Sequence, residues 1–415
     1  MSGVASILPG PALAPLVPAS LPGEKGLPLR SRWPLHAADE VEAVAEVLRS
    51  GRVNALLHGD ECRAFEQAFA AFCDMPYAFS VANGTLALEL ALRALGIGPG
   101  DEVIVPARSF FATASCVSIC GATPVFADVD PESQNITADT LAAAITPRTR
   151  AVIVVHLAGW PCAMDDIAGV AAAHGLRMIE DCAQAHGASY RGRLAGSFGD
   201  ASAFSFCTDK IMSTGGEGGM VLFRDRSAAQ RARSFKDHGM NFAAHGQPGG
   251  PGFRWLRDTI GSNYRMTEMQ AAIGRRQLRK LPGWLHFRRQ NADLLNTLLA
   301  DTPALRLTVP GPEIKHAYYK YYAFVRSEEL RSGWTRDRIV AEVNERGCPC
   351  FTGICPEIYL ELAYRGRPRT PRKRLPGAQR LGEESLMLQV DQTLSPDQVE
   401  RMAEIVDVVM AQAAR

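Results

Sequence analysis

Short apolar runs alternate with helical stretches through the middle of the chain, and this alternation limits the possible folds more than any other feature. Runs that resemble strands lie at residues 78–81, 102–105, 124–127, 151–156 and 177–180, and the intervening segments at 85–95, 111–120 and 167–174 have helical spacing. Strands separated by helices of this length are typical of a largely parallel sheet covered on both faces. Two later runs, 201–206 and 219–223, are joined by a glycine-rich loop, which predicts a hairpin or an edge strand.

The pattern changes after about residue 280. We expect helices at 267–281 and 282–299 with a break at Pro282, a strand-like region at 317–325, and helices at 335–345 and 395–413. A polar segment at 241–252, rich in glycine and proline, reads as an ordered loop or insertion. The sequence therefore predicts a flexible leader at 1–28, a large α/β domain at 29–280 and a smaller α+β domain at 281–415.

Charge and cysteine content exclude several classes of protein. The 45 Lys and Arg residues nearly balance the 44 Asp and Glu residues, so nothing favours nucleic acid as a partner. No apolar stretch reaches the roughly 18 to 20 residues that span a bilayer. The ten cysteines show neither zinc-site spacing nor the density of a disulfide scaffold. We expect a cytoplasmic protein without a metal site, a membrane segment or a nucleic-acid surface.

Lys210 is the lysine that most invites a chemical role. It follows the apolar run 201–206 and precedes the glycine-rich loop 213–219, so it lies near a strand end beside a loop that can approach a ligand closely. A lysine in such a place can act as an amine nucleophile. On this observation alone, a solvated surface lysine is the simpler interpretation.

Other polar groups follow the ends of other predicted strands. Asp181 closes the run 177–181 at the edge where open α/β sheets bind ligands. Gly84 and Thr85 lie between a strand and a helix, where backbone amides and the helix dipole can hold a phosphate, although on these residues alone an ordinary helix cap is the simpler interpretation. Ser205 can add a hydroxyl to the same phosphate. Phe110 follows the strand at 103–105 and offers either an aromatic face to a ring or a core contact.

Together these groups provide an amine, a carboxylate, an aromatic face and a phosphate seat at one predicted edge. Pyridoxal 5′-phosphate requires this set, because its ring nitrogen must stay protonated for the ring to accept electrons. In an ordered series of blocks the chain resembles the DegT/DnrJ/EryC1/StrS aminotransferases, from about residue 33 to the C-terminal helix. The blocks are NGTLAL at 83–88, GDEVIVP at 100–106, IEDCAQAHG at 179–187, FSF at 204–206 with Lys210, GEGG at 216–219 and NYRMTEMQAA at 263–272.

The resemblance implies the fold and a role for each matching residue. The fold is that of the fold type I transferases dependent on pyridoxal phosphate, with a mostly parallel sheet between helices and a smaller C-terminal domain. Lys210 would bind the cofactor covalently, Asp181 would face the pyridine nitrogen, and Gln184 and Phe110 would contact the ring. The remaining implied contacts are to the phosphate: Gly84, Thr85 and Ser205 from the same subunit, and Asn263 from the neighbouring subunit of a homodimer.

The resemblance also implies the reaction, which is amination of a nucleotide-linked keto-deoxy sugar in amino sugar and polysaccharide biosynthesis, with glutamate as donor. A keto-cyclitol or an aminobenzoate-type precursor is an alternative substrate, and a non-catalytic member of the family is a further alternative. The chain departs from the family at Cys207, where many members have histidine, and in the insertion at 246–255. We interpret His156, His186 and His238, and also Cys348, Cys350 and Cys355, as structural residues.

Overall fold

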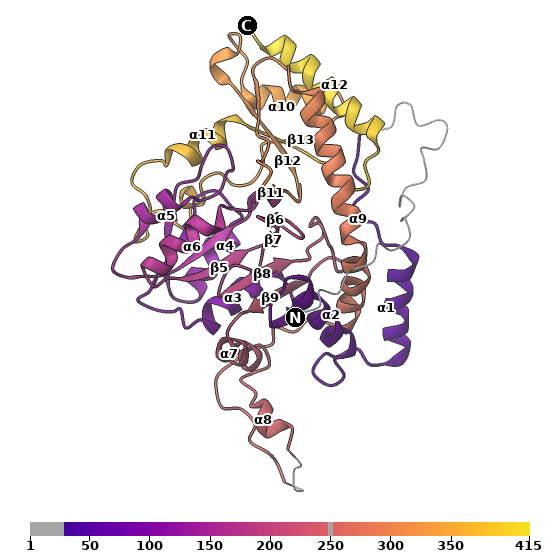
Figure 1. Ribbon diagram of the computed structural model, residues 1–415, viewed down its shortest axis with the longest axis vertical. Helices are drawn as coiled ribbons and strands as arrows, with labels where there is room; N and C mark the ends of the chain where they lie inside the picture. Colours follow the sequence, from indigo (N-terminus) through magenta and orange to yellow (C-terminus); the bar gives the residue numbers. More distant parts are fainter. Residues whose placement is uncertain (1–28, 248–251) are drawn as a thin grey trace, which may run out of the picture.

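The computed structural model describes residues 29–247 and 252–415, so the leader predicted at 1–28 lies outside the described residues. A seven-stranded sheet forms the centre (Figure 1). In spatial order its strands are β1 (Tyr77–Val81), β9 (Gly219–Phe223), β8 (Ala201–Ser205), β5 (Arg177–Asp181), β4 (Thr149–Val155), β2 (Glu102–Pro106) and β3 (Thr123–Ala127). Pairing is parallel from β8 to β3, and β9 is antiparallel to both β1 and β8. The prediction of a mostly parallel sheet is confirmed.

The hairpin predicted from the two later runs is confirmed, but the alternative of an edge strand is wrong. β8 and β9 pair antiparallel, and β9 lies inside the sheet because β1 pairs along its other side. All five residues of β9 are buried, as an internal strand requires.

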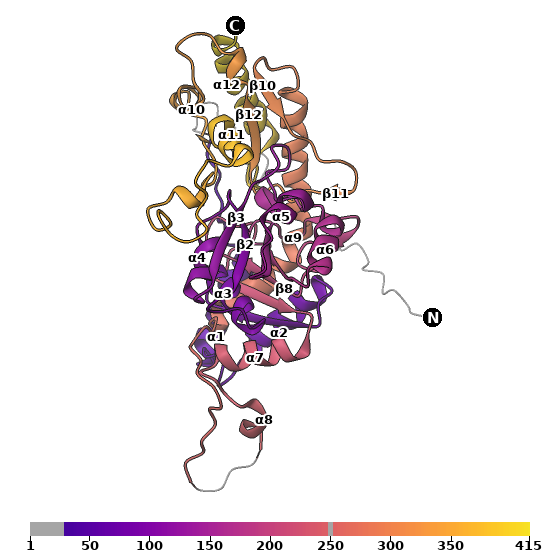
Figure 2. The ribbon, with the colours of Figure 1, turned by 90° about the vertical axis from the view of Figure 1, so that its left-hand side faces the viewer.

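Helices cover both faces of the sheet. Figure 2 shows α3 (Gly84–Ala94) and α4 (Ala112–Ile119) on one side, with α6 (Met164–Ala173) and α9 (Glu268–Leu298) on the other. The remaining helices of this region are α1 (Ala38–Ser50), α2 (Asp60–Phe72), α5 (Ala138–Ala144), α7 (Arg226–Lys236) and α8 (Phe242–His245). Gly51 ends α1 in the left-handed conformation (φ 67°), as its place in the sequence suggests. None of the described helices has both the length and the hydropathy of a membrane span.

The helix break predicted at Pro282 is wrong, because α9 runs through it without interruption. Proline removes one backbone hydrogen bond from a helix. Pro282 lies on the exposed side of α9, whereas Leu281, Trp284 and Leu285 are buried in a cluster rich in aromatic side chains. Burial of these three side chains offsets the lost bond, and α9 joins the central sheet to the C-terminal region (Figure 1).

The C-terminal region has its own antiparallel sheet, with β10 (Leu305–Leu307), β12 (Tyr321–Val325), β14 (Ser385–Leu388) and β13 (Cys350–Phe351) in that order. Its helices are α10 (Arg336–Glu345), α11 (Pro376–Glu384) and α12 (Pro396–Ala413). A small sheet of β11 (Ile314–Lys315), β6 (Ser189–Tyr190) and β7 (Arg193–Leu194) links it to the centre. A domain boundary near residue 280 stays a prediction.

The strand predicted at 317–325 is shorter than expected. β12 starts at Tyr321, because Tyr318 has a positive φ of 46° that interrupts extended backbone. The amides of Ala317 and Tyr319 instead donate to the carbonyls of Gly159 and Ala158, at 2.9 and 2.8 Å. This detour brings Tyr319 to the edge of the central sheet.

Candidate active site

The sequence-predicted residues lie at one edge of the central sheet. β1, β2, β5 and β8 all point the same way, since β9 is antiparallel to both of its neighbours. Gly84 follows β1, Phe110 follows β2, Asp181 ends β5 and Lys210 follows β8. The carboxyl ends of parallel strands are the usual ligand edge of an open α/β sheet. The topology therefore gathers residues that are far apart in the sequence.

The N-terminus of α3 lies at this edge and leaves room for an anion to approach its backbone. The Asn83 side chain accepts a hydrogen bond from the Leu86 amide at 2.9 Å, so Asn83 caps α3. The backbone amides of Gly84 and Thr85 have no acceptor in the described part of the chain. A Cβ on Gly84 would lie 2.6 Å from the Cβ and 3.2 Å from the Oγ of Ser205. Two free amides and a hydroxyl thus meet at the start of a helix, where an anion is stabilised.

Asp181 is buried and held in place by two donors. Thr113 Oγ1 donates to Oδ2 at 3.0 Å, and the Ala183 amide donates to Oδ1 at 3.2 Å. Burial raises the pKa of Asp181, while these hydrogen bonds and the charge of Lys210 act in the opposite direction. Sequence reasoning missed Thr113, which lies in the first turn of α4 and also pairs with Ser109 Oγ at 2.9 Å.

Lys210 lies in the turn after β8, and only 16% of its side chain is exposed. Its Nζ donates to Tyr319 Oη at 3.4 Å and lies 4.0 Å from Asp209 Oδ1. Its backbone carbonyl accepts a hydrogen bond from the Trp33 indole at 2.7 Å. The sequence pattern predicts Tyr319 within a strand, so it does not indicate this contact with Lys210.

The other predicted residues are placed as follows. Gln184 is buried, and its Oε1 accepts from the Ala158 amide at 2.7 Å. Phe110 is 62% exposed, and Asn263 is also exposed. In the described part of the chain neither makes a hydrogen bond, an ion pair or a ring contact with Lys210 or Asp181. The carbonyl of Tyr264, next to Asn263, accepts from the Ala82 amide at 2.9 Å, close to the start of α3.

The buried histidines belong to the core. His156 Nε2 lies 2.9 Å from Glu180 Oε2, and its Nδ1 accepts from the Cys162 amide at 3.1 Å. Glu180 also accepts hydrogen bonds from three backbone amides. Glu180 and His156 lie close to Cys182 in a group that could hold a metal ion, but their ligand atoms are already occupied by these hydrogen bonds. His186 packs between two phenylalanines, and burial lowers its pKa to about 3, which keeps the ring neutral.

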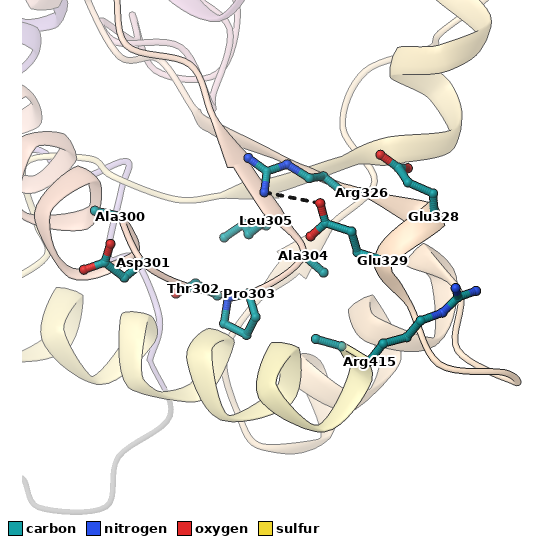
Figure 3. Close-up of a pocket in the computed structure, with 11 residues that line it drawn as sticks. Ala300, Asp301, Thr302, Pro303, Ala304, Leu305, Arg326, Glu328, Glu329 and Arg415 are labelled. Atoms are coloured by element: carbon teal, nitrogen blue, oxygen red, sulfur yellow. Dashed lines mark ion pairs between the residues drawn. The ribbon is translucent and has the colours of Figure 1, made fainter.

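A surface cavity of about 520 Å³ lies in the C-terminal region, away from this edge (Figure 3). Its walls include residues 300–305 together with Arg326, Glu329 and Arg415, and Arg326 and Glu329 form an ion pair at 3.6 Å. None of the residues predicted from the sequence lines it. This cavity is therefore separate from the predicted residues.

The model of the DegT/DnrJ/EryC1/StrS aminotransferase family matches residues 34–407. The chain belongs to this family. Among solved structures, the aminotransferase from Psychrobacter cryohalolentis is 47% identical with a TM-score of 0.90, and the match covers 92% of this chain and 99% of that one. A dTDP-3-amino-3,4,6-trideoxy-alpha-D-glucose transaminase from Streptomyces venezuelae is 37% identical, over 96% of this chain and 98% of that protein. An L-glutamine:2-deoxy-scyllo-inosose aminotransferase from Streptomyces paromomycinus is 39% identical, over 84% and 85%.

Aminotransferases of this family depend on pyridoxal 5′-phosphate, and the residues of this aminotransferase fit that group. The missing side chain at Gly84 leaves room next to Ser205, and the two free amides beside it suit a phosphate. Asp181 provides a buried carboxylate for a protonated ring nitrogen, and Lys210 provides a primary amine at the same edge.

Proposed function

We propose that this aminotransferase replaces the ketone of a nucleotide-linked keto-deoxy sugar with an amine, with glutamate as the amino donor. The observation that carries the proposal is the arrangement of Lys210, buried Asp181 and the free amides of Gly84 and Thr85 at one sheet edge. The sugar substrate is supported by the similarity to a dTDP-sugar transaminase along nearly the whole chain.

Each residue has a defined part in the proposal. Lys210 binds the cofactor covalently and, when released, moves a proton between the donor carbon and the cofactor. Asp181 keeps the ring nitrogen protonated, Gln184 and Phe110 hold the ring, and Gly84, Thr85 and Ser205 hold the phosphate. When bound, pyridoxal phosphate supplies an electron sink for the bonding electrons of the C–H bond that breaks.

We further propose that the enzyme is a cytoplasmic homodimer in which Asn263 reaches the phosphate bound by the partner. Exposure of Asn263 supports this, and so do two aromatic side chains earlier in the same region. Phe253 and Trp255 are 81% and 89% exposed and pack edge-on with ring centroids 4.8 Å apart. Large exposed aromatic side chains are enriched at protein interfaces. Ten free thiols are consistent with a reducing compartment.

A keto-cyclitol is the second candidate substrate, favoured by the similarity to an inosose aminotransferase. Purified enzyme should be assayed with glutamate and with glutamine against a nucleotide-linked keto sugar and against an inosose. We expect a higher kcat/KM for the nucleotide-linked sugar. A preference for the inosose would replace the proposed substrate.

Lys210→Ala tests the proposed chemistry. We expect the wild-type enzyme to be yellow and to keep the cofactor attached after borohydride reduction, whereas the variant should bind it only reversibly. Lys315→Ala, an exposed lysine of β11, is the control and should behave like the wild type. Reduced cofactor attached to the Lys210→Ala variant would overturn the assignment of the lysine.

A further inference from the structure

Tyr319 joins Lys210 to Asp209 through a chain of hydrogen bonds. A lysine ammonium can only donate, so Lys210 Nζ donates to Tyr319 Oη at 3.4 Å. The Tyr319 hydroxyl in turn donates to the Asp209 carboxylate. The Lys210 nitrogen also lies 4.7 Å from the centroid of the Tyr319 ring, within the range of a cation–π contact.

Tyr319 is itself firmly placed. Only 8% of the residue is exposed, its amide donates to the Ala158 carbonyl at 2.8 Å, and its own carbonyl accepts from buried Arg288 at 3.3 Å. Burial and the Asp209 charge raise the pKa of Tyr319 well above its usual value, so the phenol remains a neutral donor. The pKa of Asp209 is lowered, since Lys210, Tyr319 and Lys320 together outweigh the opposing effect of burial.

We propose that Tyr319 is a positioning residue that holds the amine of Lys210 whenever the lysine is not bonded to the cofactor, with Asp209 fixing the phenol. The inference rests on the proposed role of Lys210. Over one full cycle the amine would leave the cofactor in the first half-reaction and would have to return to the same atom at the end of the second. A free lysine side chain samples many rotamers, and a fixed acceptor such as the Tyr319 hydroxyl restricts it to few of them. Packing in the aromatic core alone requires the Tyr319 ring but not its hydroxyl, so removing the hydroxyl separates the two roles.

Competitive labelling of the cofactor-free enzyme measures how firmly the amine is held. A trace of acetic anhydride is added, and the acetylation of Lys210 is compared by mass spectrometry with that of exposed Lys315. Loss of one hydrogen bond corresponds to about a fivefold change. We therefore expect Tyr319→Phe to raise the labelling of Lys210 about fivefold relative to Lys315, and Asp209→Asn to raise it as well.

Tyr321→Phe is the matched control. Tyr321 is buried in the same segment and donates to Asn296 Oδ1 at 2.8 Å, so the substitution also removes one buried hydroxyl. Labelling of Lys210 should stay at the wild-type level in this variant. In the holoenzyme, Tyr319→Phe should lower kcat with little change in KM for the amino donor.

Equal labelling of Lys210 in wild type, Tyr319→Phe and Tyr321→Phe would overturn the proposal. So would a rise of the same size in both tyrosine variants, because it would reflect general loosening. Failure of the proposed chemistry is a different result: Lys210→Ala would then keep its activity, whatever the labelling shows.

Discussion

Replacing Gly84 with alanine should weaken cofactor binding without unfolding the enzyme. The added methyl group would lie 2.6 Å from the Cβ of Ser205 and 3.2 Å from its Cα. These atoms belong to the end of β8 and cannot rotate away, so the start of α3 must move. That movement displaces the two free amides and the Ser205 hydroxyl relative to one another.

The expected loss of cofactor affinity follows from the contact between the added methyl group and Ser205. Forcing one extra methyl group into a packed site costs about 1 to 3 kcal/mol. If the displacement falls on the phosphate seat, this corresponds to about a 5- to 150-fold rise in the dissociation constant of pyridoxal phosphate. Alanine in a helix gains roughly 0.5 to 1 kcal/mol over glycine, which offsets part of this cost, so the cofactor-free protein should stay folded with a modest loss of stability.

Cofactor titration of the apoenzyme by absorbance, with thermal unfolding of the same samples, provides the assay. Gly169→Ala within α6 is the control, because no atom lies within 4 Å of the added Cβ. It should raise the melting temperature slightly and leave the dissociation constant unchanged. A Gly84→Ala enzyme that binds pyridoxal phosphate as tightly as the wild type would refute a phosphate seat at α3.

Three further predictions concern other parts of the molecule. Asp181→Asn removes the buried charge but keeps the shape, so kcat should fall about 10²- to 10³-fold with unchanged circular dichroism. Trp255→Asp should raise the dimer dissociation constant about tenfold or more in sedimentation velocity, and an unchanged dimer would place the interface elsewhere. Burial alone would raise the pKa of Glu102, but hydrogen bonds from Arg369, Thr146 and Arg148 lower it to about 2. A depressed carboxyl pKa stabilises the fold above the unfolded pKa of about 4.5. With 64% of the Arg148 side chain exposed, solvent screening limits this to about 1 to 2 kcal/mol. In urea unfolding, the free energy of unfolding of the wild type should exceed that of Glu102→Gln by this amount at pH 7. The difference should vanish as the pH falls towards 2.

The sheet was predictable from the sequence because its internal strands are buried on both faces and separated by helices. Such strands appear as continuous apolar runs, as in the fully buried β8 and β9. The place of β9 within the sheet was not predictable, because it depends on pairing between residues 77–81 and 219–223. Local patterns also misjudged Pro282, since the burial of its neighbours outweighs the intrinsic preference of proline.

The candidate site was predictable to the extent that it consists of strand ends. Lys210 and Asp181 follow recognisable apolar runs, and parallel strands bring their carboxyl ends to one edge. Tyr319 lies 109 residues after Lys210, and it reaches the site through the positive φ of Tyr318. Tyrosine rarely adopts that conformation, so neither its position nor its contact with Lys210 could be inferred from alternating side chains.

The loop after β4 connects Gln184 and Tyr319. The Ala158 amide donates to Gln184, and the Ala158 carbonyl accepts from Tyr319. Next to it, a Cβ on Gly159 would lie 3.0 Å from both the Ala317 side chain and the Gln184 carbonyl, so only glycine allows the two segments to approach this closely. Tyr319 continues directly into β12, and Arg288 of α9 holds the carbonyls of Tyr318 and Tyr319. A shift of the C-terminal sheet must therefore move Tyr319 and strain the contact with Gln184, which makes the geometry around Lys210 depend on how that sheet is seated.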